Sequence, residues 1–69
     1  MAVIELTQTN FDDVVQGNDC VIVDFWAPWC GPCRTFSPIF DKVSDQHPDV
    51  VFAKVNIDEE SGLAADFNI

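Results

Sequence analysis

Short hydrophobic runs alternate along the chain with stretches in which hydrophobic residues recur at helical spacing. The runs from Ala2 to Leu6, from Cys20 to Trp26 and from Val50 to Ile57 predict three strands. The middle run, CVIVDFW, is apolar at nearly every position, as is typical of a parallel strand that is buried on both faces. We therefore expect Cys20 to Trp26 to form the central strand.

Three helical stretches follow the three strands, because hydrophobic residues recur in them every three or four positions. These residues are Phe11, Val14 and Val15, then Phe36, Ile39, Phe40 and Val43, and finally Leu63, Ala64 and Phe67. Strands that alternate with helices predict right-handed crossovers and a parallel sheet. The fold class is therefore α/β, with the order βαβαβα in one small domain over residues 1–69.

The expected helix boundaries rest on a few residues. Thr9 and Asp12 resemble a capping box that opens the first helix, which Gly17 and Asn18 close. Pro38 should kink the second helix, which ends near His47 and Pro48. Asp58 is expected to be the N-cap of the last helix, and the acidic run Asp58 to Glu60 to stabilise its N-terminus.

The composition narrows the possible partners and the compartment. Twelve acidic and three basic residues give a net charge of −9, the wrong sign for binding nucleic acid or an anionic membrane. The sequence has no signal-peptide pattern and no apolar stretch of about 20 residues, so we expect a cytoplasmic protein. Three cysteines, an odd number, fit a reduced compartment with reactive thiols better than a disulfide framework.

Cys30 and Cys33 stand two residues apart, between the second strand and the second helix. Parallel sheets carry their chemistry at this carboxyl end of the strands, and the amides of a helix N-terminus favour the thiolate of Cys30. Cys30 would attack a substrate disulfide, and Cys33, more enclosed, would resolve the mixed disulfide. Gly31 and Pro32 keep the loop tight, and a proline is tolerated at a helix start.

Two other interpretations of the thiol pair remain open at this point. A metal site would recruit Cys20 and His47 as further ligands, although zinc sites usually combine two close-spaced couples and this chain has one. The pair could also be inert buried cysteines. Cys20 by itself is expected to be a small hydrophobic core residue.

Asp24 is the most informative residue after the thiols, because it is a carboxylate inside an apolar strand, on the face shared by Ile22 and Trp26. Burial would raise its pKa and make it a proton acceptor for Cys33. The alternative is an aspartate that reaches solvent from a frayed strand end. Trp26 is expected to pack, whereas Trp29, next to the nucleophile, favours contact with substrate over packing.

The sequence WCGPC, preceded by VDFWAPW and followed by a helix that contains a proline, resembles the active-site region of the thioredoxin family along the whole chain. The resemblance implies a thioredoxin-like fold of three layers. It implies that Cys30 is the nucleophile, Cys33 the resolving thiol and Trp29 the exposed aromatic residue beside them. Asp24 and Lys54 match the family's buried carboxylate and its neighbouring lysine. Gly31 and Pro32 are the further substrate-contact candidates.

The resemblance also implies partners and chemistry. Members of the family reduce protein disulfides, carry no bound cofactor or metal, and are re-reduced by a thioredoxin reductase that uses flavin and NADPH. Complete members continue beyond the position of Ile69 with a cis-proline segment, two strands and a helix. We therefore expect a truncated fold in which Cys20 to Trp26 is an exposed edge, reduced reductase activity, and self-association into a homodimer through that edge. A non-catalytic fragment that acts by association is the alternative function.

Overall fold

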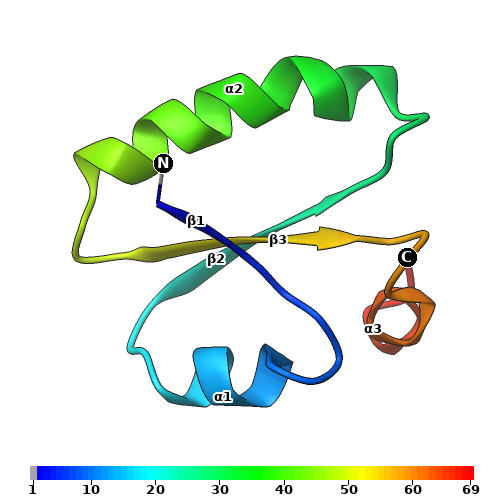
Figure 1. The fold of residues 1–69 in the computed structure, drawn as a ribbon, viewed down its shortest axis with the longest axis horizontal. Helices are drawn as coiled ribbons and strands as arrows, with labels where there is room; N and C mark the ends of the chain where they lie inside the picture. Colours follow the sequence, from blue (N-terminus) through cyan, green and yellow to red (C-terminus); the bar gives the residue numbers. More distant parts are fainter. Residues whose placement is uncertain (1) are drawn as a thin grey trace.

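The computed structural model describes residues 2–69, and its elements follow the expected order (Figure 1). The strands are β1 (Val3–Glu5), β2 (Val21–Trp26) and β3 (Val51–Asn56), and the helices are α1 (Phe11–Gln16), α2 (Gly31–Gln46) and α3 (Ser61–Asp66). The predicted α/β class and the βαβαβα order are confirmed. None of these helices is long and apolar enough to span a bilayer.

The three strands form one parallel sheet in the order β1-β3-β2, so β3 and not β2 is the middle strand of residues 2–69. The prediction of a central β2 is wrong in this respect. An apolar run reports that side chains pack on both faces of a strand, but it carries no information on how many strands lie beside its backbone. Within the described chain one edge of β2 pairs with β3 and the other edge is unpaired, as the resemblance led us to expect.

The helices cover the sheet in three layers. Figure 1 shows α2 along one face of the sheet, with α1 and α3 on the other face. The buried core lies on the α1 and α3 side and consists of Leu6, Ala53, Val55 and Leu63, against which Phe11, Val14, Val21, Val23 and Phe25 pack. Under α2, the rings of Phe40 and Phe52 meet edge to face at 5.3 Å.

Two predicted helix starts are wrong. The N-cap of α1 is Asn10 and not Thr9, and the Asn10 side chain instead accepts a hydrogen bond from the Thr7 amide at 2.7 Å. The N-cap of α3 is Glu60 and not Asp58, because the backbone first makes a turn. In that turn the amides of Asp58 and Glu59 both donate to the side-chain oxygen of Asn56.

Candidate redox-active site

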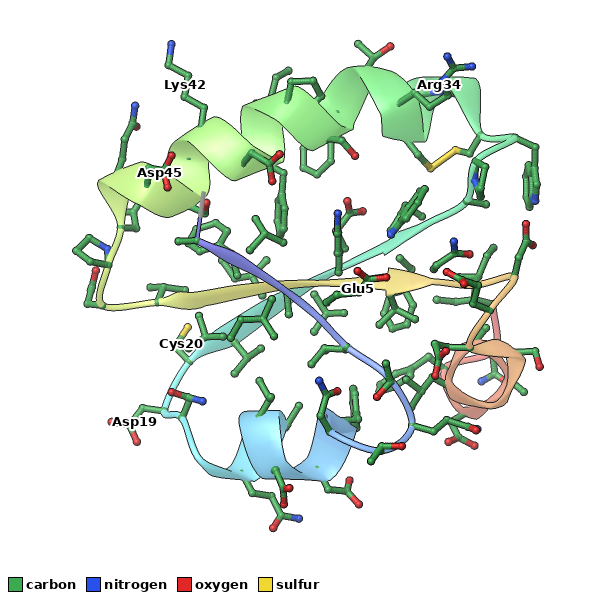
Figure 2. The ribbon with its side chains drawn as sticks, viewed as in Figure 1. Glu5, Asp19, Cys20, Arg34, Lys42 and Asp45 are labelled. Atoms are coloured by element: carbon green, nitrogen blue, oxygen red, sulfur yellow. A yellow bond between two sulfur atoms is a disulfide. The ribbon has the colours of Figure 1, made fainter. Side chains whose placement is uncertain are left out.

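The thiol pair lies where β2 leads into α2. Cys30 is the N-cap of α2 with an extended backbone, and its sulfur accepts a hydrogen bond from the Cys33 amide at 3.3 Å. The two cysteines form a disulfide with 5.2 Å between their Cα atoms. Figure 2 shows this bond at the N-terminal end of α2, and the exposed side chain of Arg34 pointing away from the sheet beside it.

Local sequence explains why the helix begins at the disulfide. Gly31 and Pro32 occupy the first helical positions, where the missing N–H of a proline has no partner to lose. The Arg34 amide then donates to the Cys30 carbonyl at 3.1 Å, which closes the first turn. A Cβ added at Gly31 would meet nothing within 4 Å, so space for a side chain does not dictate glycine there. The substrate contacts of Gly31 and Pro32 stay a prediction.

Pro38 lies inside α2 without ending it. The helix runs without interruption through 16 residues, from Gly31 to Gln46. His47 is its C-cap, as the sequence predicted to within one residue. The helix therefore separates Cys30 from His47 by about 26 Å along its axis, at ~1.5 Å per residue.

Asp24 lies within β2 and not at a frayed strand end. Its in-register partner on β3 is Lys54, and its side chain shares the α2 face of the sheet with Ile22. Desolvation raises the pKa of the Asp24 carboxyl above its usual 3.8, and the Lys54 ammonium acts in the opposite direction. Asp24 therefore lies on the sheet face beneath α2, the helix that carries Cys33, and its pKa is raised by burial.

Lys54 also contacts the aromatic residue that follows Asp24 on the same face. Its Nζ lies 5.6 Å from the centre of the Trp26 ring. Trp26 is partly buried, as its expected packing role requires, but its indole N–H is buried without a hydrogen-bond partner within residues 2–69. The structure thus brings Asp24, Trp26 and Lys54 together on the sheet face beneath α2.

Trp29 makes a contact that sequence reasoning missed. Its ring is 71% exposed, and its indole N–H donates to both carboxylate oxygens of Asp58, at 3.0 and 3.2 Å. Asp58 is therefore a neighbour of the thiol site rather than a helix cap. Only the fold joins the two residues, which are 29 positions apart, so no spacing pattern in the sequence signals the pair.

Cys20 and His47 do not approach the thiol pair. Cys20 is exposed and precedes β2, whereas Cys30 follows it, so they lie at opposite ends of the strand (Figure 2). The prediction that Cys20 is a core residue is wrong, because the strand begins one residue later, at the surface of the molecule. The metal interpretation lacks its ligands, and no cluster of three or more potential metal ligands occurs among residues 2–69.

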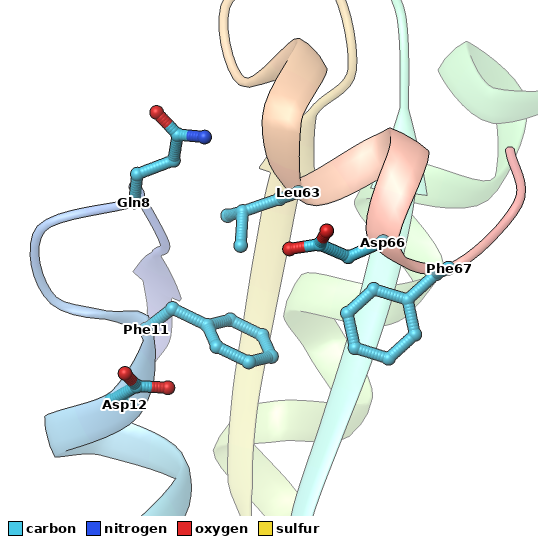
Figure 3. Close-up of a pocket in the computed structure, with 6 residues that line it drawn as sticks. All are labelled: Gln8, Phe11, Asp12, Leu63, Asp66 and Phe67. Atoms are coloured by element: carbon cyan, nitrogen blue, oxygen red, sulfur yellow. The ribbon is translucent and has the colours of Figure 1, made fainter.

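Two hollows lie on opposite faces of the sheet. One of about 280 Å³ separates α1 from α3, where the rings of Phe11 and Phe67 meet at 5.7 Å and Asp12 and Asp66 stand nearby (Figure 3). The other, of about 290 Å³, lies between α2 and the sheet and is lined only by apolar residues. We call this cavity the apolar hollow, and its lining residues are Ile22, Phe36, Ile39, Phe40, Val43 and Phe52.

Comparison with known proteins places this site in a family context. The thioredoxin family model matches residues 2–69. The thioredoxin of Alicyclobacillus acidocaldarius is 44% identical over 69 residues, which are 99% of this chain and 66% of that protein. Thioredoxin C-3 of Corynebacterium nephridii is 43% identical over 96% of this chain and 46% of its own length. The chain thus spans about half to two thirds of these relatives.

A solved structure gives the same result for the fold. The structure of Plasmodium falciparum thioredoxin superimposes with a TM-score of 0.91 and 40% sequence identity, over 96% of this chain and 66% of that one. The fold of this chain is therefore shared with a solved thioredoxin structure.

Proposed function

The chain belongs to the thioredoxin family, and on that premise we propose that it is a thiol-disulfide oxidoreductase that reduces disulfides in other proteins. The observation that carries the proposal is the disulfide between Cys30 and Cys33 at the N-terminus of α2. A dithiol that closes to a disulfide within one helical turn can deliver two electrons to a substrate disulfide and take up two electrons again from an external reductant.

The reaction proceeds in two exchange steps. The Cys30 thiolate attacks one sulfur of the substrate disulfide, so a mixed disulfide forms and the other substrate sulfur leaves as a thiolate, which takes up a proton. The Cys33 thiol then loses its proton and attacks the Cys30 sulfur, which releases the second substrate thiolate. The substrate gains two electrons and two protons, and the Cys30–Cys33 disulfide of the structure is the oxidised product.

Local groups assist both steps. The Cys33 amide, which donates to the Cys30 sulfur in the disulfide, is placed to stabilise the thiolate in the reduced protein. Asp24, with its raised pKa, accepts the proton of Cys33 through a water molecule, and Lys54 limits how far that pKa rises. Trp29, Gly31 and Pro32 surround Cys30 and contact the substrate chain.

The cycle requires an external source of electrons. We assign this role to a flavin- and NADPH-dependent thioredoxin reductase, so the chain acts as an electron carrier without a cofactor of its own. The odd number of cysteines and the closely spaced thiol pair support a reducing, cytoplasmic setting.

Trapping the mixed disulfide tests the function. Cys33→Ser, reduced and mixed with a disulfide-containing protein such as insulin, should accumulate a covalent adduct that dithiothreitol dissolves. Cys30→Ser is the matched control and should form none, because it keeps Cys33 but lacks the nucleophile; both variants also carry Cys20→Ser, since the exposed Cys20 thiol could form adducts of its own. Equal adduct formation by both variants, or its absence from both, would overturn the proposal.

Association with a second copy is the further partner assignment that the structure supports. Within residues 2–69 the outer edge of β2 has unpaired backbone groups, and the apolar hollow lies beside it. Edges of this kind pair with other strands, and a second β2 has the matching apolar sequence. We assign a homodimer through this edge as the second mode of action of the chain.

A further inference from the structure

We propose that Asp58 is a positioning residue of the thiol site, which holds the indole ring of Trp29 in a fixed orientation for substrate beside Cys30. The inference rests on the proposed function and deepens it. Asp58 does not cap α3, whose N-cap is Glu60, and both of its carboxylate oxygens receive the Trp29 N–H, at 3.0 and 3.2 Å. A hydrogen bond to an ionised acceptor is stronger than one between neutral groups.

The loop that presents Asp58 is itself held firmly. Asn56, the last residue of β3, is only 7% exposed. Its side-chain oxygen accepts from the amides of Asp58 and Glu59 at 2.9 and 3.3 Å, and its amide group donates to the Glu59 carboxylate at 3.1 Å. The Ile57 amide donates to the Trp26 carbonyl at 2.9 Å and ties the loop to the end of β2. Asp58 is therefore fixed relative to the strand that leads into the thiol loop.

The Trp29 ring needs such a support. Its exposed fraction of 71% is the highest among the exposed large hydrophobic side chains of the described residues. An exposed indole without a partner exchanges between rotamers, and ordering it when substrate binds costs free energy. The bond to Asp58 orders the ring beforehand, so a protein substrate meets a preformed apolar surface directly beside Cys30.

This role predicts which kinetic constant changes. The second-order rate constant for a disulfide-containing protein should fall about 2- to 10-fold in Asp58→Ala, the range expected for ordering one side chain on binding. A small disulfide such as 2-hydroxyethyl disulfide has no flanking chain to contact the ring, so its rate constant should not change. The rate at which Cys33 releases the mixed disulfide should not change either.

Matched variants separate the bond from the charge. Trp29→Phe keeps a ring but removes the N–H, and it should slow the protein substrate as much as Asp58→Ala, with no further loss in the double variant. Asp58→Asn keeps an acceptor oxygen and should retain most of the rate. Asp49→Ala removes the same charge from an exposed residue at the other end of β3 and should behave as the wild type.

A spectroscopic measurement reports on the bond without turnover. The indole N–H signal of Trp29 in a ¹H–¹⁵N spectrum should move in Asp58→Ala and stay in place in Asp49→Ala. An unmoved signal, multiplied losses in the double variant, or equal slowing with the small disulfide would overturn the role of Asp58. A wild-type chain that exchanges with neither disulfide would instead refute the proposed function and this role with it.

Discussion

Asp24 and Asp58 are residues of one type whose roles the fold sets apart. Asp24 lies in β2 opposite Lys54, where desolvation raises its pKa, whereas Asp58 lies in a turn and holds an exposed indole N–H. The environment of Asp24 was predictable, because a carboxylate inside an apolar strand is desolvated by the side chains around it. The contact of Asp58 with Trp29 was not, because three consecutive acids before a helix are also what a helix N-terminus favours.

The proton-accepting role of Asp24 predicts a change in the pH profile. In the wild type the release of the mixed disulfide should accelerate as pH rises through the raised pKa of Asp24 and its carboxylate forms. Asp24→Asn should lose this inflection and slow release at neutral pH by on the order of 10²-fold, the lower range for general base catalysis. Single-turnover release from a preformed mixed disulfide, measured over pH, tests this expectation.

A second variant, Lys54→Gln, should shift the pKa of Asp24 in a known direction. The Lys54 ammonium lowers the pKa of Asp24, so its removal should move the inflection to higher pH without abolishing it. An inflection that persists in Asp24→Asn would contradict the assignment.

The raised pKa of Asp24 also predicts how the stability of the folded chain depends on pH. Because the folded-state pKa lies above the usual 3.8, the folded chain binds the proton more strongly than the unfolded chain. Stability then falls as pH rises from about 3.8 through the folded-state pKa, and the loss is complete above it. Asp24→Asn should therefore melt at a higher temperature than the wild type at pH 7, by an amount that shrinks as pH approaches 3.8. A constant or reversed difference in thermal midpoint would contradict this prediction.

At the scale of elements, the presence of each helix and strand and their order along the chain were predictable from the sequence. The residues at which the helices begin and the pairing of the strands were not. Apolar runs predicted all three strands and helical spacing predicted all three helices, because both patterns are local properties of the chain. The N-caps of α1 and α3 differ from prediction, because the side chains of Asn10 and Asn56 bond turn amides before each helix begins. Asn, Asp, Ser and Thr side chains can all form such local bonds, either in a turn or at a helix N-cap. The sequence therefore does not show which of several nearby candidates becomes the N-cap.

Two aliphatic residues in and next to the short strand β1 should differ in how much they contribute to the free energy of unfolding. Leu6 follows β1 and is 0% exposed in the core, whereas Ile4 within β1 is 39% exposed. Leu6→Ala should lower the free energy of unfolding by about 2–5 kcal/mol, because it leaves a cavity. Ile4→Ala is the matched control and should cost less than about 1.5 kcal/mol, since part of its side chain is already hydrated. Urea denaturation of the two variants measures both, and equal losses would contradict the core assignment.

At the scale of the whole molecule, the three layers leave one side of the sheet partly uncovered. Ile22, Phe36 and Ile39 of the apolar hollow are between 44 and 55% exposed, and they lie beside the edge of β2 that has no partner strand within residues 2–69. Exposed apolar surface next to a free edge is typical of an interaction site. The sequence predicted this edge only through the family resemblance, since no residue pattern within β2 distinguishes an edge strand from a middle one.

The association proposal predicts a concentration-dependent size. The sedimentation coefficient of the wild type should rise with concentration, and Ile39→Lys should weaken self-association about 10-fold or more by placing a charge on the hollow. Val15→Lys is the control, because Val15 is also an exposed aliphatic residue but belongs to α1, on the other side of the sheet. A wild-type chain that stays monomeric at all concentrations would contradict the proposal.

The net charge of −9 predicts a preference among substrates. Disulfide peptides flanked by lysine should react at least about 10-fold faster than matched peptides flanked by glutamate at low ionic strength, because the field of the molecule attracts cations. The ratio should approach one near 1 M salt, where charges are screened beyond ~3 Å. A ratio that does not depend on salt would show that the charge does not guide encounter.

The sequence by itself determined the class of the fold, the order of its elements and the thiol pair with its carboxylate, because periodicity, a Cys-x-x-Cys spacing and a charge within an apolar run are local properties. Only the tertiary structure decided that β3 lies between β1 and β2, that Cys20 is exposed, and that Asp58 meets Trp29. These facts depend on which distant segments become neighbours. Sequence spacing does not record such contacts, because crossovers bring together residues that are tens of positions apart.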